Sequence, residues 1–192
     1  MKIFWQRWDD LMNQSPKLAE PRNWIKHRSS SILIGGLVYH FGHRYEESIN
    51  ECKKTVALDP TFFVAHRYMG LSYAQLGMHK EARTSFEKAV NASNRSPLMR
   101  AEYAYAVALS GDATKAQTEL AELIEISNQK YLSAYHIAAI YVALKDNVHA
   151  LEWLDKAYHD RADWMVFLKV DPRFNSLHSD QKFIGLLRPM NL

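Results

Sequence analysis

The sequence predicts an all-α protein in which pairs of helices stack in series around one continuous core. Three observations predict this class: an ordinary globular composition, few turn-forming residues, and internal similarity at a constant step. The chain has 192 residues, of which 47% are hydrophobic and 23% charged, enough to bury a substantial core. Its seven glycines and six prolines are too few for an all-β protein, which turns about every dozen residues.

The internal similarity appears when the chain is aligned with itself, shifted so that position 36 meets position 70. Gap-free columns of related residues then line up. One column holds small residues: Gly36, Gly70, Ala104 and Ala138. Two others hold larger ones: Tyr39, Tyr73, Val107 and Tyr141, then Cys52, Phe86, Leu120 and Leu154. Four copies without an insertion indicate a repeat array.

Each copy divides into two helices around a polar turn, most clearly in the second copy. Residues 63–76 and 80–92 carry apolar residues at steps of three and four, the spacing of amphipathic helices. Gly77 ends the first helix, because glycine tolerates the left-handed conformation found there. A small residue such as Gly70 lets two backbones approach closely, and Phe86 fills the space that remains.

Gly70-x-x-Tyr73 and Ala82-x-x-x-Phe86, with Pro60 closing the copy before, resemble the tetratricopeptide repeat. The resemblance covers residues 29–162, in copies 29–62, 63–96, 97–130 and 131–162. The early tryptophan of the family is replaced in every copy, by Ile32, His66, Arg100 and Ala134. The resemblance implies a right-handed α-solenoid of about four repeats, with a concave inner face that binds a peptide or a protein.

A narrower resemblance concerns the end of the chain. Residues 150–158, Trp164, residues 168–174 and Ser179-Asp180 look like the C-terminal part of bacterial tetratricopeptide regulators. In those proteins the array commonly follows a DNA-binding, nucleotide-cyclase or kinase domain, and the stretch 1–28 before the first copy is too short for one. The resemblance implies a bacterial regulatory or signalling context without the output activity.

Both ends of the array are expected to be covered, because a stack of repeats exposes an apolar face at each terminus. In the N-terminal capping segment, residues 1–28, an apolar stripe predicts a short helix: Phe4, Trp8, Leu11 and Met12. We expect it to dock on the first copy; the alternatives are a hook for a partner and a basic helix on an anionic membrane surface. Residues 163–192 predict two short capping helices, separated by Pro172.

Charge and hydropathy exclude several classes of protein. Residues 1–31 hold six basic and three acidic residues, which leaves 18 of each sign in the rest of the chain. Such a balanced body lacks the basic stripe of nucleic-acid binding proteins, so we expect no nucleic-acid ligand. The longest apolar run, Ile32–Tyr39, is far below the roughly 20 residues that span a bilayer. With no export signal and one cysteine, the sequence predicts a cytoplasmic location.

No residue pattern predicts catalysis, a metal or a cofactor. Cys52 shares its column with large apolar residues, which predicts a buried, protonated and inert thiol. His40 and His43 lack further ligands at a suitable spacing. Gly35-Gly36 falls inside a predicted helix, not in a phosphate-binding loop. We therefore expect a protein that is not an enzyme.

The repeat register predicts which side chains line the concave groove. They are Leu33, Leu37, His40, Phe41, Arg67, Tyr68, Leu71, Gln75, Leu98, Glu102, Tyr105, Tyr135, His136 and Val142. The resemblance also implies that the clamp for chaperone C-terminal carboxylates is missing, because Leu33 and Leu37 stand at its positions. What remains is apolar and tyrosine-rich, with Arg67 facing Glu102.

The predicted function is a non-catalytic scaffold that binds a peptide or protein segment in this groove, since tyrosine and arginine dominate binding energy at interfaces. Part of the groove could instead be covered by the chain's own N-terminal segment. The alternative function is structural self-assembly, in which exposed aromatic ends form a homodimer.

Overall fold

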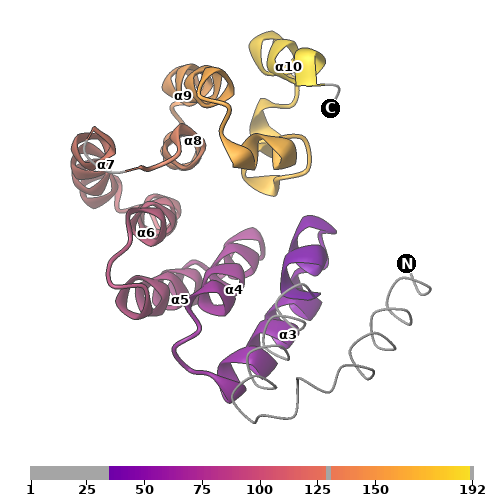
Figure 1. Cartoon of the computed structure of the whole chain (residues 1–192), viewed down its shortest axis with the longest axis vertical. Helices are drawn as coiled ribbons and strands as arrows, with labels where there is room; N and C mark the ends of the chain where they lie inside the picture. The colour runs from indigo at the N-terminus through magenta and orange to yellow at the C-terminus, as the bar shows by residue number, and fades with distance from the viewer. Residues whose placement is uncertain (1–34, 129–130, 191–192) are drawn as a thin grey trace, which may run out of the picture.

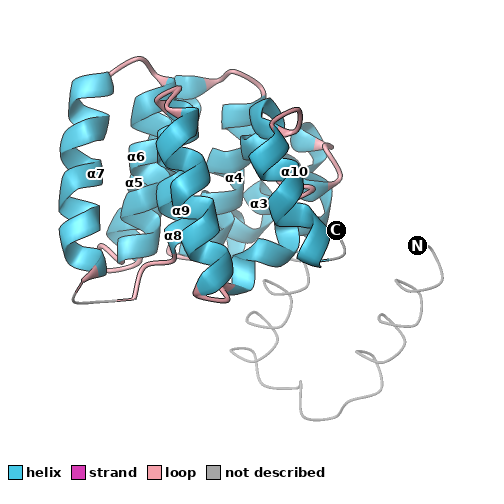
Figure 2. Ribbon diagram, turned by 90° about the horizontal axis from the view of Figure 1, so that it is seen from above, coloured by secondary structure: helices cyan, strands magenta, loops and turns pink. Residues whose placement is uncertain are grey.

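The computed structural model describes residues 35–128 and 131–190, and every regular element in that part is helical. The helices follow one another around an arc, which is open on the right-hand side of Figure 1. Seen from above, the long helices stand side by side (Figure 2). The predicted all-α solenoid is confirmed. Leu33 and the N-terminal apolar stripe lie outside the described residues.

The helices come in pairs joined by short turns. Residues 35–41 are helical and precede α3 (Tyr45–Leu58). The pairs that follow are α4 (Phe63–Gln75) with α5 (His79–Ala92), α6 (Pro97–Leu109) with α7 (Ala113–Ser127), and α8 (Ala134–Ala143) with α9 (Asn147–His159). Because α3, α5, α7 and α9 begin at positions 45, 79, 113 and 147, the step of the sequence repeat is also the period of the structure.

The turn between the two helices of each pair contains one residue with a positive φ, again at this constant step. These residues are His43, Gly77, Gly111 and Lys145, with φ values of 57°, 72°, 88° and 64°. Gly77 therefore ends its helix as predicted, because glycine adopts this conformation without steric cost. The same backbone geometry recurs even where the residue carries a side chain.

The column of small residues marks where the two helices of a pair approach most closely. A Cβ atom built on Gly70 would lie 2.8 Å from the Phe86 ring, and one on Gly36 would lie 2.6 Å from Cys52 Sγ. Phe86 and Cys52 are completely buried. The prediction that these two columns pack against each other is confirmed in the first two pairs.

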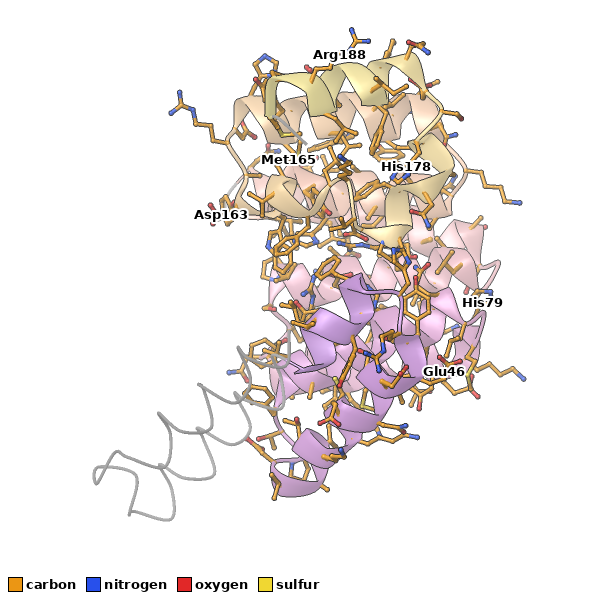
Figure 3. All side chains as sticks on the ribbon, turned by 90° about the vertical axis from the view of Figure 1, so that its right-hand side faces the viewer. Glu46, His79, Asp163, Met165, His178 and Arg188 are labelled. Atoms are coloured by element: carbon orange, nitrogen blue, oxygen red, sulfur yellow. The ribbon has the colours of Figure 1, made fainter. Side chains whose placement is uncertain are left out.

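The chain after α9 does not continue the stack as two capping helices. Helix α10 (Gln181–Leu187) packs against α9, as expected of a cap. Before it, two 3-10 helices, η2 (Asp163–Phe167) and η3 (Pro172–Leu177), turn back across the open side of the arc. Figure 3 looks onto this side and shows Asp163 and Met165 on η2, with His178 directly after η3. We call residues 163–177 the covering segment; η4 (Arg188–Met190) follows α10.

Candidate protein-interaction site

The predicted groove residues within the described part lie on the first helix of each pair, the helices that line the concave face. Leu37, His40 and Phe41 come from residues 35–41, and the others from α4, α6 and α8. Eight of them are buried: His40, Arg67, Tyr68, Leu71, Glu102, Tyr105, Tyr135 and His136. Leu37, Phe41, Gln75, Leu98 and Val142 are half-buried. The concave face is therefore filled in this structure, and most of its side chains pack together.

Leu98 is the groove residue that the structure places elsewhere. Its side chain packs with Ala89, Val90 and Met99, in a small apolar cluster between α5 and α6. By contrast, Leu37, Phe41 and Val142 pack against the main core. Position 98 lies in the first turn of α6, where the side chain meets the neighbouring α5 before it can reach the concave side.

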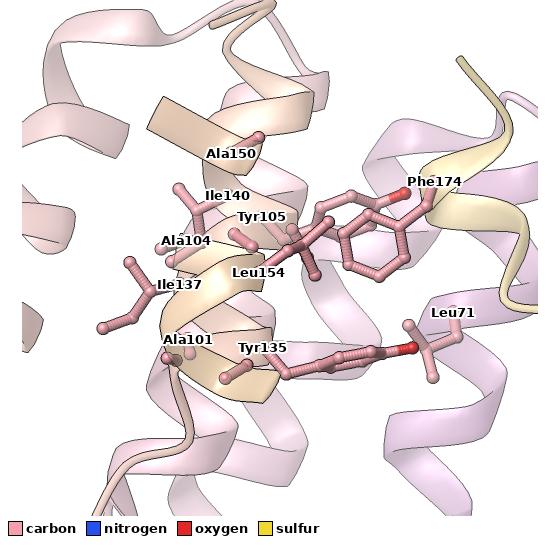
Figure 4. Packing of buried hydrophobic residues seen from close by; sticks show 14 of the residues in the cluster. Leu71, Ala101, Ala104, Tyr105, Tyr135, Ile137, Ile140, Ala150, Leu154 and Phe174 are labelled. Atoms are coloured by element: carbon pink, nitrogen blue, oxygen red, sulfur yellow. The ribbon is translucent and has the colours of Figure 1, made fainter. Parts of the chain in front are cut away.

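The covering segment is what buries the concave face. Phe167 stacks on Phe41 with ring centroids 4.7 Å apart, which links the two ends of the array. Trp164 packs on the Arg67 guanidinium, whose Cζ atom lies 4.5 Å from the ring centroid. Phe174 belongs to the same core cluster as Tyr105, Tyr135 and Leu71 (Figure 4). Among the described residues, the chain's own occupant of the groove is C-terminal, whereas the sequence suggests the N-terminal segment.

A buried network of charges joins α4, α6 and α8 to the covering segment. Arg67 donates to Glu102 Oε1 from Nη2 at 2.6 Å and from Nε at 2.9 Å, so the predicted pairing is confirmed. Arg173 Nη1 donates to the other oxygen, Glu102 Oε2, at 3.1 Å. Asp171 accepts from Arg173 Nη2 at 2.6 Å and from the Tyr135 hydroxyl at 2.7 Å. Two cations and two carboxylates thus compensate each other in the protein interior.

The pKa values of these groups follow from burial and from their partners. Burial disfavours the charged carboxylates, but Arg67 and Arg173 outweigh it and hold the pKa of Glu102 well below its ordinary value. Burial also raises the pKa of Asp171, but Arg173 lowers it more, so that the pKa lies below its ordinary value. Burial raises the pKa of Tyr135 well above its ordinary value, so its hydroxyl stays a donor to Asp171. The network is ionised at neutral pH.

Two histidines of the concave face are kept neutral. Burial lowers the pKa of His40 and of His136 from 6.5 to about 4. His40 Nδ1 lies 3.1 Å from Ser72 Oγ. His136 packs edge-on against Trp164 and places Nδ1 3.5 Å from Glu102 Oε1. Neither imidazole is poised to exchange a proton near neutral pH.

We expect the free energy of unfolding to fall as the pH drops from about 6.5 to 4. In this window the unfolded chain protonates His40 and His136, whereas the folded chain keeps them neutral, so protons favour unfolding. A shift of this size corresponds to roughly 3 kcal/mol for each histidine. Urea unfolding at pH 7.0, 5.5 and 4.5 measures the effect.

His43→Gln is the matched control, because the His43 side chain is exposed and, within the described part, its imidazole hydrogen-bonds only to the Tyr45 hydroxyl. His136→Gln should flatten the pH dependence, whereas His43→Gln should leave its slope unchanged. Glu102 and Asp171 contribute stability above their ordinary pKa values of 4.5 and 3.8, which is lost as the pH falls further. Equal unfolding free energies at pH 7.0 and 4.5 would contradict the burial of the histidines.

The remaining candidate chemistry has structural explanations. Cys52 is fully buried, so its predicted burial is confirmed, and burial raises the pKa of its thiol to about 12. His40 and His43 have different partners, Ser72 and Tyr45. Over residues 35–128 and 131–190, no three histidine, cysteine or acidic side chains cluster as a metal site would require.

Sequence reasoning places Asp171 and Arg173 in a terminal cap and misses their role in the concave face. The one feature of the sequence that points to these residues is the run Asp171-Pro172-Arg173-Phe174, which resembles the C-terminal part of bacterial tetratricopeptide regulators. Periodicity cannot reveal this role, because the segment is not an α-helix and its partners lie in distant repeats. The charged pair also resembles ordinary surface residues until its burial is known.

The tetratricopeptide repeat family model matches residues 69–95, which span the end of α4, the turn and α5. No curated protein matches the chain. A solved structure, an O-GlcNAc transferase mutant of Thermobaculum terrenum, is similar with a TM-score of 0.57 at 18% sequence identity. The match covers 69% of this chain and 26% of the transferase chain, so the matched part spans about a quarter of that chain.

The period, the helix pairs and these matches together define the class: the chain is a solenoid with the fold of tetratricopeptide repeats, and the family model matches one of its repeats. At this level of identity the transferase establishes the fold alone. In the described part of the chain, no helix combines the length and apolar character needed to cross a membrane.

Proposed function

We propose that this protein is a non-catalytic scaffold whose concave face holds a segment of a partner protein. One observation carries the proposal: the face already holds a protein segment from outside the repeats, residues 163–177 of its own chain. The contacts come from the side-chain types that dominate protein interfaces, namely tyrosine, tryptophan and arginine. A surface that orders one such segment has the shape and chemistry to order another.

The state of the ionisable groups supports a role without turnover. The buried carboxylates are paired with arginines, and burial lowers the pKa values of His40 and His136 to about 4. A general base works best with a pKa near the operating pH, which neither imidazole has. The thiol of Cys52, with a pKa of about 12, is no nucleophile. The chemistry of the face is therefore that of recognition.

The setting of the scaffold is also a proposal. The resemblance of residues 150–158 and 168–174 to the tails of bacterial tetratricopeptide regulators supports a place in a regulatory assembly. The single cysteine supports a cytoplasmic location. In such an assembly this chain would position a partner that carries the output activity.

The test compares the wild-type chain with Phe167→Ala. This change removes the stack on Phe41, loosens the covering segment and makes the concave face easier to enter. A partner identified by capture and mass spectrometry, then purified, should bind Phe167→Ala about two- to tenfold more tightly, as expected for loss of a stacked aromatic pair. Isothermal titration calorimetry measures the affinity.

Val166→Ser is the matched control, because Val166 neighbours Phe167 but is 64% exposed. It should leave the affinity unchanged. Hydrogen exchange should show α4, α6 and α8 protected in the complex. A partner that binds all three proteins equally and protects only α5 and α7 would refute a concave binding site. A chain that pairs only with itself would favour the homodimer.

A further inference from the structure

The core of the covering segment is the stretch Asp171-Pro172-Arg173-Phe174. All four residues are buried, with Asp171 1%, Arg173 5% and Phe174 0% exposed. In the same segment Val166 and Val170 are 64% and 43% exposed. Connecting segments normally keep charged side chains in water, so a fully buried acidic and basic pair is unusual there. Met165, Leu168 and Leu177 of the segment are buried too, but they are apolar, so Asp171 and Arg173 are its buried charged pair.

The side chains of Asp171, Arg173 and Phe174 each contact the concave face. The Asp171 carboxylate accepts from the hydroxyl of Tyr135 on α8 at 2.7 Å. The Arg173 guanidinium donates to Glu102 on α6 at 3.1 Å. It also lies over the Tyr135 ring, with Cζ 5.4 Å from the centroid.

The third place is apolar and takes the aromatic ring. The Phe174 ring meets the Tyr135 ring edge-on, with centroids 5.0 Å apart. Figure 4 shows it entering the cluster that also contains Tyr105 and Leu154. The Tyr135 hydroxyl thus recognises the acceptor, Glu102 recognises the cation, and the Tyr135 ring lies against both the cation and the aromatic ring.

The stretch is also organised by its own contacts. Arg173 donates to Asp171 from Nη2 at 2.6 Å, from Nε at 3.0 Å and from its backbone amide at 3.0 Å. Pro172 restricts the backbone between them. A ligand that is preorganised in this way loses less conformational entropy on binding. The recognised unit is therefore the acid and the arginine two positions apart, followed directly by the aromatic residue.

Without the segment, the solenoid would present an incomplete set of partners. Glu102 would keep Arg67 on Oε1 but leave Oε2 unpaired, and the Tyr135 hydroxyl would lose its acceptor. When a ligand covers the face again, the carboxylate oxygen favours a cationic donor and the hydroxyl favours an acceptor. The charge complementarity of the empty face thus specifies the same ligand that the chain supplies itself.

We propose that the concave face binds partner proteins through an Asp-x-Arg-aromatic segment, which takes the place of residues 171–174. The inference rests on the proposed scaffold function and names the ligand class. The chain's own segment is then a competitor at high effective concentration, so that a partner binds only when its segment outcompetes it.

The test uses a fluorescein-labelled peptide with the sequence of residues 168–177, Leu-Lys-Val-Asp-Pro-Arg-Phe-Asn-Ser-Leu, and the full chain. The receiving variant carries Asp171→Ala and Arg173→Ala together, which frees the face by removing one charge of each sign. By fluorescence anisotropy, the peptide should bind this variant at least about tenfold more tightly than the wild type, whose site is occupied. Circular dichroism checks that the variant keeps the helical content of the wild type.

Matched probes isolate the recognised groups. A peptide with the changes Asp171→Asn and Arg173→Gln should bind the receiving variant at least about tenfold more weakly than the unchanged peptide does, because hydrogen bonds to charged groups are lost. Adding Tyr135→Phe to the receiving variant removes one hydroxyl and should lower its affinity for the unchanged peptide. If the double variant does not fold, hydrogen exchange on the wild type with excess peptide should show residues 163–177 becoming exposed.

Three outcomes would overturn the proposal. They are equal binding of the two peptides, no binding to the folded double variant, and no exposure of residues 163–177 in the exchange experiment. A wild-type dimer in light scattering that the double variant abolishes would assign the segment to a second copy of the chain. If a purified partner binds the concave face while both peptides bind equally, the scaffold function stands and only the ligand class fails.

Discussion

Glu102→Ala is expected to lower the free energy of unfolding by about 3–5 kcal/mol, because it leaves two buried arginines without their shared carboxylate. Arg67 would lose both of its hydrogen bonds to Glu102, and Arg173 would keep only Asp171. Neither guanidinium can give up its proton or reach water in the folded chain. Guanidinium unfolding monitored by circular dichroism measures the change.

Glu47→Ala is the matched control. Glu47 also pairs with an arginine, Arg44, at 2.8 Å, but the two side chains are 45% and 56% exposed. Water and salt screen an exposed pair of this kind, so Glu47→Ala should leave the free energy of unfolding almost unchanged. A loss below about 1 kcal/mol for Glu102→Ala would mean that water reaches the carboxylate. The concave face would then be open instead of covered.

Phe86→Ala is expected to cost about 3–5 kcal/mol, the usual cost of removing a buried phenylalanine. Phe86 is completely buried between α4 and α5, and its ring fills the space above Gly70. The loss is a large share of the roughly 5–15 kcal/mol that stabilises a domain. Unchanged unfolding would mean that the repeat register is wrong at this position.

Gly70→Ala provides the second half of a double-mutant cycle. Its Cβ would lie 2.8–2.9 Å from three atoms of the Phe86 ring, so alanine should destabilise the wild type by about 1–3 kcal/mol. In the Phe86→Ala background the clash is gone and alanine should be neutral or stabilising. Additive effects of the two changes would contradict the contact, because only residues in contact couple this strongly.

The repeat architecture could be predicted from the sequence because its determinants are local. Gly70 and Phe86 lie within one pair of helices, and the same sequence spacing joins Gly36 to Cys52. Apolar residues at steps of three and four then define which side of each helix is buried. The residues that form the concave face follow from the same register, since a repeated unit presents the same side at every copy.

The pairing of Arg67 with Glu102 could also be predicted from the repeat register. The two residues are 35 positions apart, one repeat plus one position, so adjacent inner helices bring them together. Whether their side chains would be open to solvent or covered could not be predicted, because that depends on a segment outside the repeats. Leu98 shows the same limit, since its side chain packs between α5 and α6 instead of in the groove.

The sequence by itself determined the class of protein, the helix pairs and the inner face, because all three follow from periodic contacts between near neighbours. Only the tertiary structure decided that residues 163–177 fill that face. Arg173 reaches Glu102 across 71 positions, in a segment of 3-10 helices that carries no periodic signal. A contact of that range depends on how the whole array curves, so the local pattern could not predict what the groove of this protein holds.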